Sequence, residues 1–140
     1  MSIILESYGF LAGKVVQLLE LDFIDKLKTY EINARQYGVL IKVNEMPNSS
    51  QKEIAEELKI DRTTMVDHVD HLESLKYIAR VKNPEDRRSY CLSITEKGKQ
   101  TLDKCWEILQ QSEQNVLAAL DNEEKALFKR YLKKILKGVV

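Results

Sequence analysis

The chain contains only two cysteines, Cys91 and Cys105, in 140 residues, so it cannot form the disulfide framework that holds small secreted domains together. Its five glycines do not form a Gly-rich phosphate loop, and no nucleophile stands beside a base in a catalytic motif. These absences argue against an enzyme. With 44% hydrophobic and 31% charged residues, the sequence predicts one ordinary globular chain that needs no cofactor.

Long hydrophobic runs are also missing. Lys14, Glu20 and Asp22 interrupt the most apolar stretch, which falls short of the roughly 20 residues that a membrane-spanning helix needs. The opening residues Met-Ser-Ile-Ile-Leu-Glu lack the cationic region and cleavage site of a signal peptide. We therefore expect a cytoplasmic protein without a membrane partner.

The chain has no excess of one charge, because 22 basic and 22 acidic residues cancel. The charge is nevertheless uneven along the sequence. Residues 76–99 contain seven basic and three acidic side chains, a local net charge of +4. Zero net charge excludes a uniformly basic nucleic-acid coat, but it allows a local basic patch.

Apolar residues spaced by three and four predict an amphipathic helix over residues 5–29. Asn33 is a candidate N-cap for a second helix, which ends before Met46-Pro47-Asn48. Ser50-Gln51-Lys52-Glu53 forms a capping box that opens a short third helix, and Asp61 caps a fourth that runs to about Leu75. Two short helices joined by such a turn form a helix-turn-helix pattern.

After the fourth helix, the spacing of apolar residues changes to every second residue. Residues 77–82 and 89–94 alternate as strands do, and the polar tip 83–88 between them completes a hairpin with a basic end. Two long helices follow, one to about Leu120 and one after the capping-box-like Asp121-Asn122-Glu123-Glu124. Gly98 lies near the start of the first, where fraying limits its cost. The fold class is mainly α with a small β-hairpin wing.

The sequence resembles the MarR family of bacterial transcriptional regulators over nearly its whole length. The resemblance rests on Asp61-Arg62-Thr63-Thr64-Met65-Val66 and on the wing Asn83-Pro84-Glu85-Asp86-Arg87-Arg88-Ser89, followed by Thr95-Glu96-Lys97-Gly98. It implies a homodimer whose terminal helices, 1–32 and 96–140, form a dimerisation region. Residues 33–95 would be the DNA-binding lobe. The apolar stripes of the terminal helices support this, since a winged helix alone could not bury them.

The N-terminal half of a recognition helix enters the major groove of duplex DNA. Candidate contacts are Arg62 to guanine or phosphate, Thr63 and Thr64 to phosphate or thymine methyl groups, Val66 to a methyl group and Asp67 to cytosine. Asp67 departs from the basic or neutral residue frequent in the family. Thr64 has capping near Asp61 as an alternative role, and Asp70 is expected to form a structural ion pair.

In the wing, Arg88 matches the family residue that enters the minor groove, and Asp86 matches the carboxylate that orients it. Arg87 would neutralise a phosphate. A solvated charged turn is the alternative. Ser50 and Gln51 open a helix whose amides can face a phosphate, although capping alone explains Ser50.

His68 and His71 lie three residues apart, a spacing that can hold zinc. No third ligand lies near in sequence, so we predict no metal, and His71 matches a family position suited to a phosphate contact. Cys91 and Cys105 are expected to act as small buried hydrophobes, because the redox-sensing relatives carry their cysteine in the first helix.

The family often binds small aromatic or amphipathic effectors between the dimer helices and the winged-helix lobe. We expect most of the candidate pocket residues to be ordinary core; the candidates are Tyr8, Phe10, Leu11, Arg35, Tyr37, Leu40 and Trp106.

The sequence thus predicts a ligand-responsive homodimeric repressor that binds a pseudo-palindromic operator in double-stranded DNA. A winged-helix module that binds protein and a thiol-based redox sensor are the alternatives.

Overall fold

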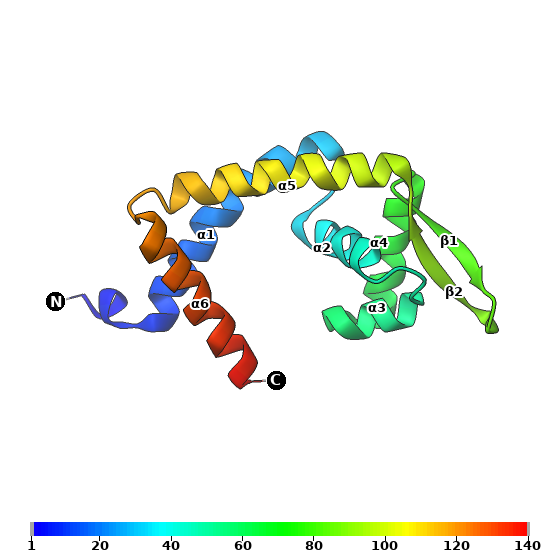
Figure 1. Ribbon diagram of the computed structural model, residues 1–140, viewed down its shortest axis with the longest axis horizontal. Helices are drawn as coiled ribbons and strands as arrows, with labels where there is room; N and C mark the ends of the chain where they lie inside the picture. Colours follow the sequence, from blue (N-terminus) through cyan, green and yellow to red (C-terminus); the bar gives the residue numbers. More distant parts are fainter. Residues whose placement is uncertain (1, 140) are drawn as a thin grey trace. The chain divides into compact units, whose positions relative to one another are not determined.

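A computed structural model describes residues 2–139 of the chain, which form six α-helices and one two-stranded sheet (Figure 1). The elements are α1 (Tyr8–Leu27), α2 (Ala34–Glu45), α3 (Gln51–Leu58), α4 (Arg62–Ser74), β1 (Ile78–Asn83), β2 (Asp86–Ile94), α5 (Glu96–Val116) and α6 (Asn122–Gly138). Short 3₁₀ turns at Ile3–Glu6 and Lys28–Tyr30 flank α1. The predicted class, mainly helical with a hairpin wing, is confirmed.

The chain forms two compact units. One contains the residues up to Phe23 together with those from Leu109 on, and the other contains Ile24–Ile108. The units therefore divide inside α1 and α5, at other points than the predicted lobe of residues 33–95. That functional division stays a prediction.

Four helices begin at the caps predicted from sequence. Asn33, Ser50 and Asp121 each accept a hydrogen bond from the backbone N–H three residues on, at 2.8, 3.0 and 2.8 Å, and the third residue's side chain closes a capping box. Asp61 accepts from the Thr64 N–H at 3.1 Å. Local sequence fixed these starts because a cap needs only its own first turn.

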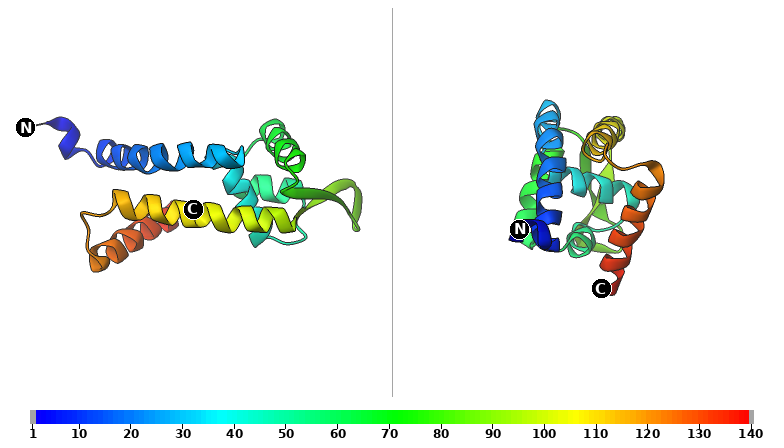
Figure 2. Two further views of the ribbon diagram at one scale, coloured as in Figure 1. Left: turned by 90° about the horizontal axis from the view of Figure 1, so that it is seen from above. Right: turned by 90° about the vertical axis from the view of Figure 1, so that its left-hand side faces the viewer.

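The core of the second unit is built from one face of each of its elements. Its largest fully buried side chains come from α1, α2, α3, α4, β1 and β2: Leu27, Leu40, Ile54, Met65, Leu72, Ile78 and Leu92. The same periodic positions predicted these helices and strands. In two views the hairpin extends away from the helices of this unit (Figures 1 and 2).

The hairpin has a shorter tip than the sequence predicted. The strands pair antiparallel from Ile78 opposite Ile94 to Asn83 opposite Asp86, so the turn is Pro84-Glu85, and residues 86–88 belong to β2. The Asn83 side chain closes this turn, since its Oδ1 accepts from the Glu85 backbone N–H at 3.0 Å and its Nδ2 donates to Ser89 Oγ at 3.1 Å. The prediction that residues 83–88 form the tip was therefore wrong for residues 86–88, which belong to a strand.

Gly98 packs against Tyr77, in the short segment between α4 and β1. A Cβ at Gly98 would overlap the Tyr77 carbonyl oxygen, so close packing requires glycine here. Thr95 caps this end of α5 by accepting from the Gly98 N–H at 3.0 Å. The explanation by helix fraying was therefore incomplete.

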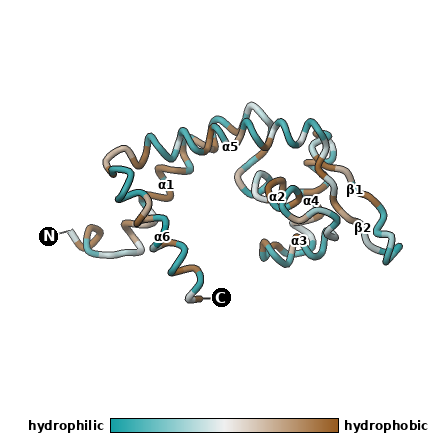
Figure 3. The backbone as a smooth tube through the Cα atoms, viewed as in Figure 1, coloured by the Kyte–Doolittle hydropathy of each residue, from teal (hydrophilic) through white to brown (hydrophobic). Residues whose placement is uncertain are grey.

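The first unit contains most of α1, the end of α5 and all of α6. Within it, the fully buried Ser112 donates to the Asp22 carboxylate at 2.6 Å, which ties α5 to α1. Large apolar side chains nevertheless stay exposed, among them Tyr8, Phe10, Leu18, Tyr131, Ile135 and Leu136. Apolar and polar positions alternate along α6 in Figure 3.

Among residues 2–139, no helix is both long and apolar enough to span a lipid bilayer.

Candidate nucleic-acid interface

The recognition helix candidate, α4, is positioned by its apolar side. Met65, Val69 and Leu72 are fully buried, one helical turn apart. The opposite side at its start presents Arg62, Thr63 and Asp67 to solvent, with Thr64 and Val66 half-buried. The burial pattern therefore brings the predicted base-contacting residues together at the exposed start of the helix.

The start of α4 carries a fixed negative charge at its cap. Hydrogen bonds from the Thr64 side chain and backbone lower the pKa of Asp61 below its usual value, because they stabilise the carboxylate. Thr64 thus has the capping role weighed for it from sequence. A DNA contact by its hydroxyl stays a prediction.

The wing presents two neighbouring arginines, one of which is held by a carboxylate. Arg88 Nε lies 3.4 Å from Asp86 Oδ1, and the Arg88 backbone N–H donates to the same oxygen at 3.0 Å. The Arg88 side chain is 92% exposed, and Arg87 beside it is exposed as well. The carboxylate therefore restrains a guanidinium that still faces solvent.

An open groove of about 570 Å³ lies between α3, α4 and β2. Arg62, Val66, Gln51 and Arg88 line it, so four of the predicted site residues share one surface. Lys52, Ser89 and Tyr90 also line it, and the sequence analysis missed them. The outward position of Tyr90 in the alternating strand, where it is 45% exposed, was the available signal.

Arg80 joins the recognition helix to the wing. Its Nη2 donates to Asp70 at 2.6 Å and its Nη1 to Glu73 at 3.0 Å, while its backbone N–H donates to Glu73 at 3.0 Å. Its Nε donates to Gln51 on α3 at 3.3 Å. The predicted structural ion pair of Asp70 is present. Arg80 therefore adds less to the free positive charge of this region than the sequence count suggested.

The start of α3 is occupied by contacts within the protein. Ser50 is buried and its hydroxyl caps the helix, while Gln51 Oε1 accepts from Arg80. Capping therefore accounts for Ser50, and phosphate contacts at both residues stay predictions.

The two histidines point to different surroundings. His71 Nε2 lies 2.6 Å from the backbone carbonyl oxygen of Glu31, so this nitrogen already has a partner. His68 Nε2 is buried with no hydrogen-bond partner among the described residues. Within residues 2–139 no three His, Cys, Asp or Glu side chains gather closely enough to hold a metal ion.

Cys105 is fully buried, and burial raises the pKa of its thiol to about 11. Cys91 is half-buried, with Sγ 3.5 Å from the Asn48 carbonyl oxygen. The expected burial as a small hydrophobe holds for Cys105 and only in part for Cys91.

The predicted effector residues differ in burial. Tyr37 and Leu40 belong to the core of the second unit, where the Tyr37 hydroxyl donates to the Leu102 carbonyl oxygen at 3.4 Å, and burial raises the Tyr37 pKa. Arg35 and Trp106 are exposed in the same unit, and the remaining three, Tyr8, Phe10 and Leu11, are exposed in the other. None of the seven lines the groove between α3, α4 and β2. The effector site stays a prediction.

Comparison with known proteins points to one family. The model of the MarR family matches residues 32–90, from the start of α2 through most of the wing. A Thauera aromatica protein, proposed as the transcriptional regulator of the hcr operon, is 32% identical over 99 residues, or 71% of this chain and 60% of its own length. The HTH-type transcriptional regulator YybA of Bacillus subtilis (strain 168) is 26% identical over 99% of this chain and 90% of its own length.

Solved structures share the fold. The transcriptional repressor CouR, bound to a 23-mer DNA duplex, superposes with a TM-score of 0.87 at 26% identity, and the match covers 97% of this chain and 96% of CouR. The similarity therefore extends over both terminal helices as well as the winged helix.

Proposed function

This chain belongs to the MarR family of winged helix-turn-helix transcriptional regulators, and from that premise we propose that it is a homodimeric, ligand-responsive repressor of a pseudo-palindromic operator. As a member of that family it is a DNA-binding transcriptional regulator and not an enzyme. A cytoplasmic location belongs to the same proposal, since a regulator of transcription acts where the DNA is.

One observation supports the assignment of the DNA-binding surface. The start of α4 and residues 88–90 of the wing line the same open groove, and Asp86 holds Arg88 in this lining while the Arg88 side chain stays 92% exposed. Holding a guanidinium before DNA arrives reduces the conformational entropy lost on binding. We assign base contacts to Arg62, Thr63, Val66 and Asp67 and minor-groove insertion to Arg88.

The dimer proposal rests on uncovered apolar surface. Tyr8 is 93% exposed, and Tyr131 and Ile135 are exposed on α6 within the same unit. Contiguous exposed apolar surface usually marks an interface. A two-fold partner covering it would pair two recognition helices about one helical turn of DNA apart, roughly 34 Å.

Repression and ligand response are the finer parts of the proposal. CouR is a transcriptional repressor with the same fold, which supports the sign of regulation. An effector that prefers one spacing of the two recognition helices would shift the dimer away from the operator-binding state.

Selection of bound duplexes from a random library, followed by sequencing, tests the proposal. The expected result is a two-fold symmetric motif with half-sites about one turn apart. The Arg88→Ala variant serves as the matched control and should enrich the motif much less. Enrichment of no motif, with only weak and salt-sensitive binding, would favour the protein-binding module instead.

A further inference from the structure

The last helix, α6, separates two kinds of side chain. At 100° per residue, its basic residues occupy about one half of the circumference and its large apolar residues, except Leu136, occupy the other. We call the basic half the cationic face; it consists of Lys125, Lys129, Arg130, Lys133, Lys134 and Lys137. The helix has only two carboxylates, both in its first turn, so its net charge is +4.

The cationic face is not neutralised within the chain. Among residues 2–139, none of the six side chains forms an ion pair, whereas Lys42 and Arg80 elsewhere each contact two carboxylates. Five of the six residues are exposed and Lys125 is half-buried. Because the whole chain has zero net charge, the residues outside this helix carry a net charge of −4.

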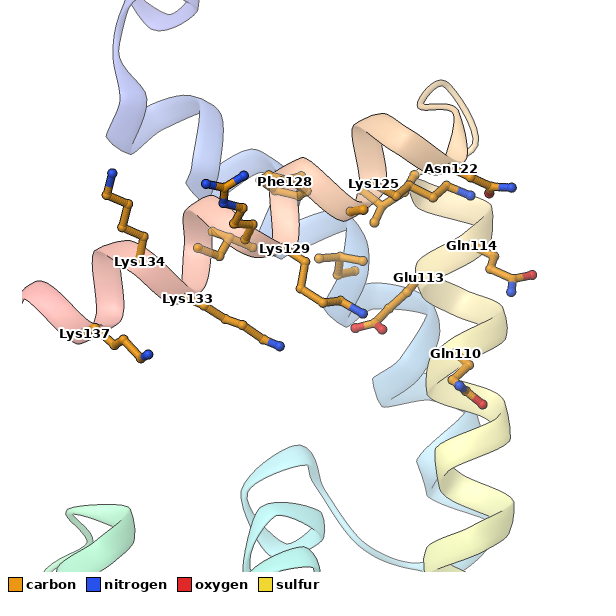
Figure 4. A pocket seen from close by; sticks show the side chains of 15 residues that line it. Gln110, Glu113, Gln114, Asn122, Lys125, Phe128, Lys129, Lys133, Lys134 and Lys137 are labelled. Carbon is orange, nitrogen blue, oxygen red and sulfur yellow. The ribbon is translucent and has the colours of Figure 1, made fainter.

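All six residues line one open groove of about 1030 Å³. Glu113 is the single carboxylate among its lining residues. In Figure 4, Lys129 and Lys133 leave α6 on the side that faces Gln110 and Glu113 of α5, and Lys134 leaves it on the opposite side. The positive charge is therefore displayed on more than one side of the helix.

We propose that the cationic face of α6 binds the phosphate backbone of duplex DNA without sequence preference. This inference rests on the proposed function, because binding of the operator by the winged helix brings duplex DNA close to the rest of the same dimer. Lys125, Lys129, Lys133 and Lys137 recur every fourth residue, which gives a row of ammonium groups about 18 Å long at 1.5 Å per residue. Duplex DNA carries about one negative charge per 1.7 Å of its axis, so such a row meets several phosphates.

A lipid surface would also suit a basic amphipathic helix. It would need the apolar half of α6, where Tyr131 and Ile135 belong to the surface assigned above to a second copy. A partner subunit that covers the apolar half leaves the cationic face to solvent. DNA needs only that face, which favours DNA over lipid.

The test compares the salt dependence of binding to a random-sequence duplex of about 40 base pairs. The variant Lys129→Gln/Lys133→Gln removes two charges from the cationic face. The matched control, Lys14→Gln/Lys104→Gln, removes two charges from exposed helical lysines on α1 and α5. Each lost phosphate contact should lower the magnitude of the slope of log K against log salt by about 0.9. For the α6 variant we expect a decrease of about 1.8 for each subunit whose cationic face contacts the duplex, and none for the control.

Equal slopes for the two variants would overturn the proposal. So would an α6 variant that changes only the dissociation of the dimer in sedimentation, or only the binding to vesicles of phosphatidylglycerol and phosphatidylcholine. Failure of the proposed function is distinguishable, because it would abolish motif enrichment in the library selection while the slope difference at α6 persisted.

Discussion

Arg88 and Asp86 are joined through both backbone and side chain. One carboxylate oxygen accepts from the Arg88 N–H at 3.0 Å and lies 3.4 Å from its Nε. The two residues are adjacent on the same face of β2, since side chains i and i+2 point the same way along a strand. The extended backbone, and not the tight turn expected from sequence, creates this pairing.

The first prediction concerns this pair. Arg88→Ala should weaken operator binding by about 1–3 kcal/mol, because it removes the contact itself. Asp86→Ala should weaken it less, since the arginine remains but is less restrained. Fluorescence anisotropy at about 0.15 M salt measures both, and sedimentation verifies that the dimer is intact. A larger loss for Asp86→Ala than for Arg88→Ala would contradict this order.

The second prediction concerns Arg80, whose side chain is only 20% exposed and contacts Asp70 and Glu73. Arg80→Ala should lower the free energy of unfolding by about 1–3 kcal/mol, because it removes charge-assisted hydrogen bonds and leaves Glu73 unpaired. Urea denaturation measures the loss. Lys82→Ala, on the same strand and exposed, is the control and should change stability by less than about 0.5 kcal/mol. Similar values for both variants would refute a structural role of Arg80.

The third prediction concerns Gly98. Gly98→Ala should destabilise the protein by about 1–3 kcal/mol, because the added methyl group collides with the Tyr77 carbonyl oxygen. Gly38→Ala provides the control, since Gly38 lies inside α2 with open space around its Cβ position. That substitution should stabilise the protein by about 0.5–1 kcal/mol. Thermal unfolding of the two variants should shift in opposite directions, and a shift in the same direction would be inconsistent with the packing at Gly98.

The fourth prediction concerns pH. The pKa of Asp61 is lowered in the folded state by hydrogen bonds from Thr64, so its contribution to stability is fully present above the unfolded pKa of about 3.9. The contribution disappears as the pH falls through the lowered folded pKa. Asp61→Asn keeps a capping side chain that does not titrate. Its urea midpoint should therefore fall less steeply than that of the wild type below about pH 4, and parallel curves would contradict the prediction.

The fifth prediction concerns the thiols. Burial raises the Cys105 pKa to about 11, so the folded Cys91→Ser variant should react very slowly with a disulfide reagent at pH 8. The Cys105→Ser variant retains the half-buried Cys91 and should react faster. Rapid reaction of Cys105 in the folded protein would reopen the redox-sensor alternative.

Helix starts and the alternation of the strands were predictable because their causes are local. Asn33, Ser50, Asp61 and Asp121 each satisfy a backbone N–H three residues on, within their own first turn. Helix ends were less predictable. α5 ends at Val116 instead of about Leu120, and α1 starts at Tyr8, after Ser7 accepts from the Phe10 N–H. The apolar pattern continues beyond the end of α5 and before the start of α1, so it does not show at which residue either helix stops.

Long-range contacts at the candidate site could not be read from spacing. Arg80 lies 29 residues from Gln51 and 10 from Asp70, yet it contacts both. His71 finds the Glu31 carbonyl 40 residues away. A charge count along residues 76–99 cannot separate a paired Arg80 from a free Arg87, because pairing depends on which elements pack together.

The sequence by itself determined the order of helices and strands, their caps and the location of the basic wing. Each of these depends on side-chain periodicity or on bonds within a few residues, and both are written in consecutive positions. Only the tertiary structure decided why Gly98 must be glycine, which cations stay unpaired and which residues share the groove beside Arg88. Those properties arise where segments distant in the chain meet, because only packing sets the distance between their atoms.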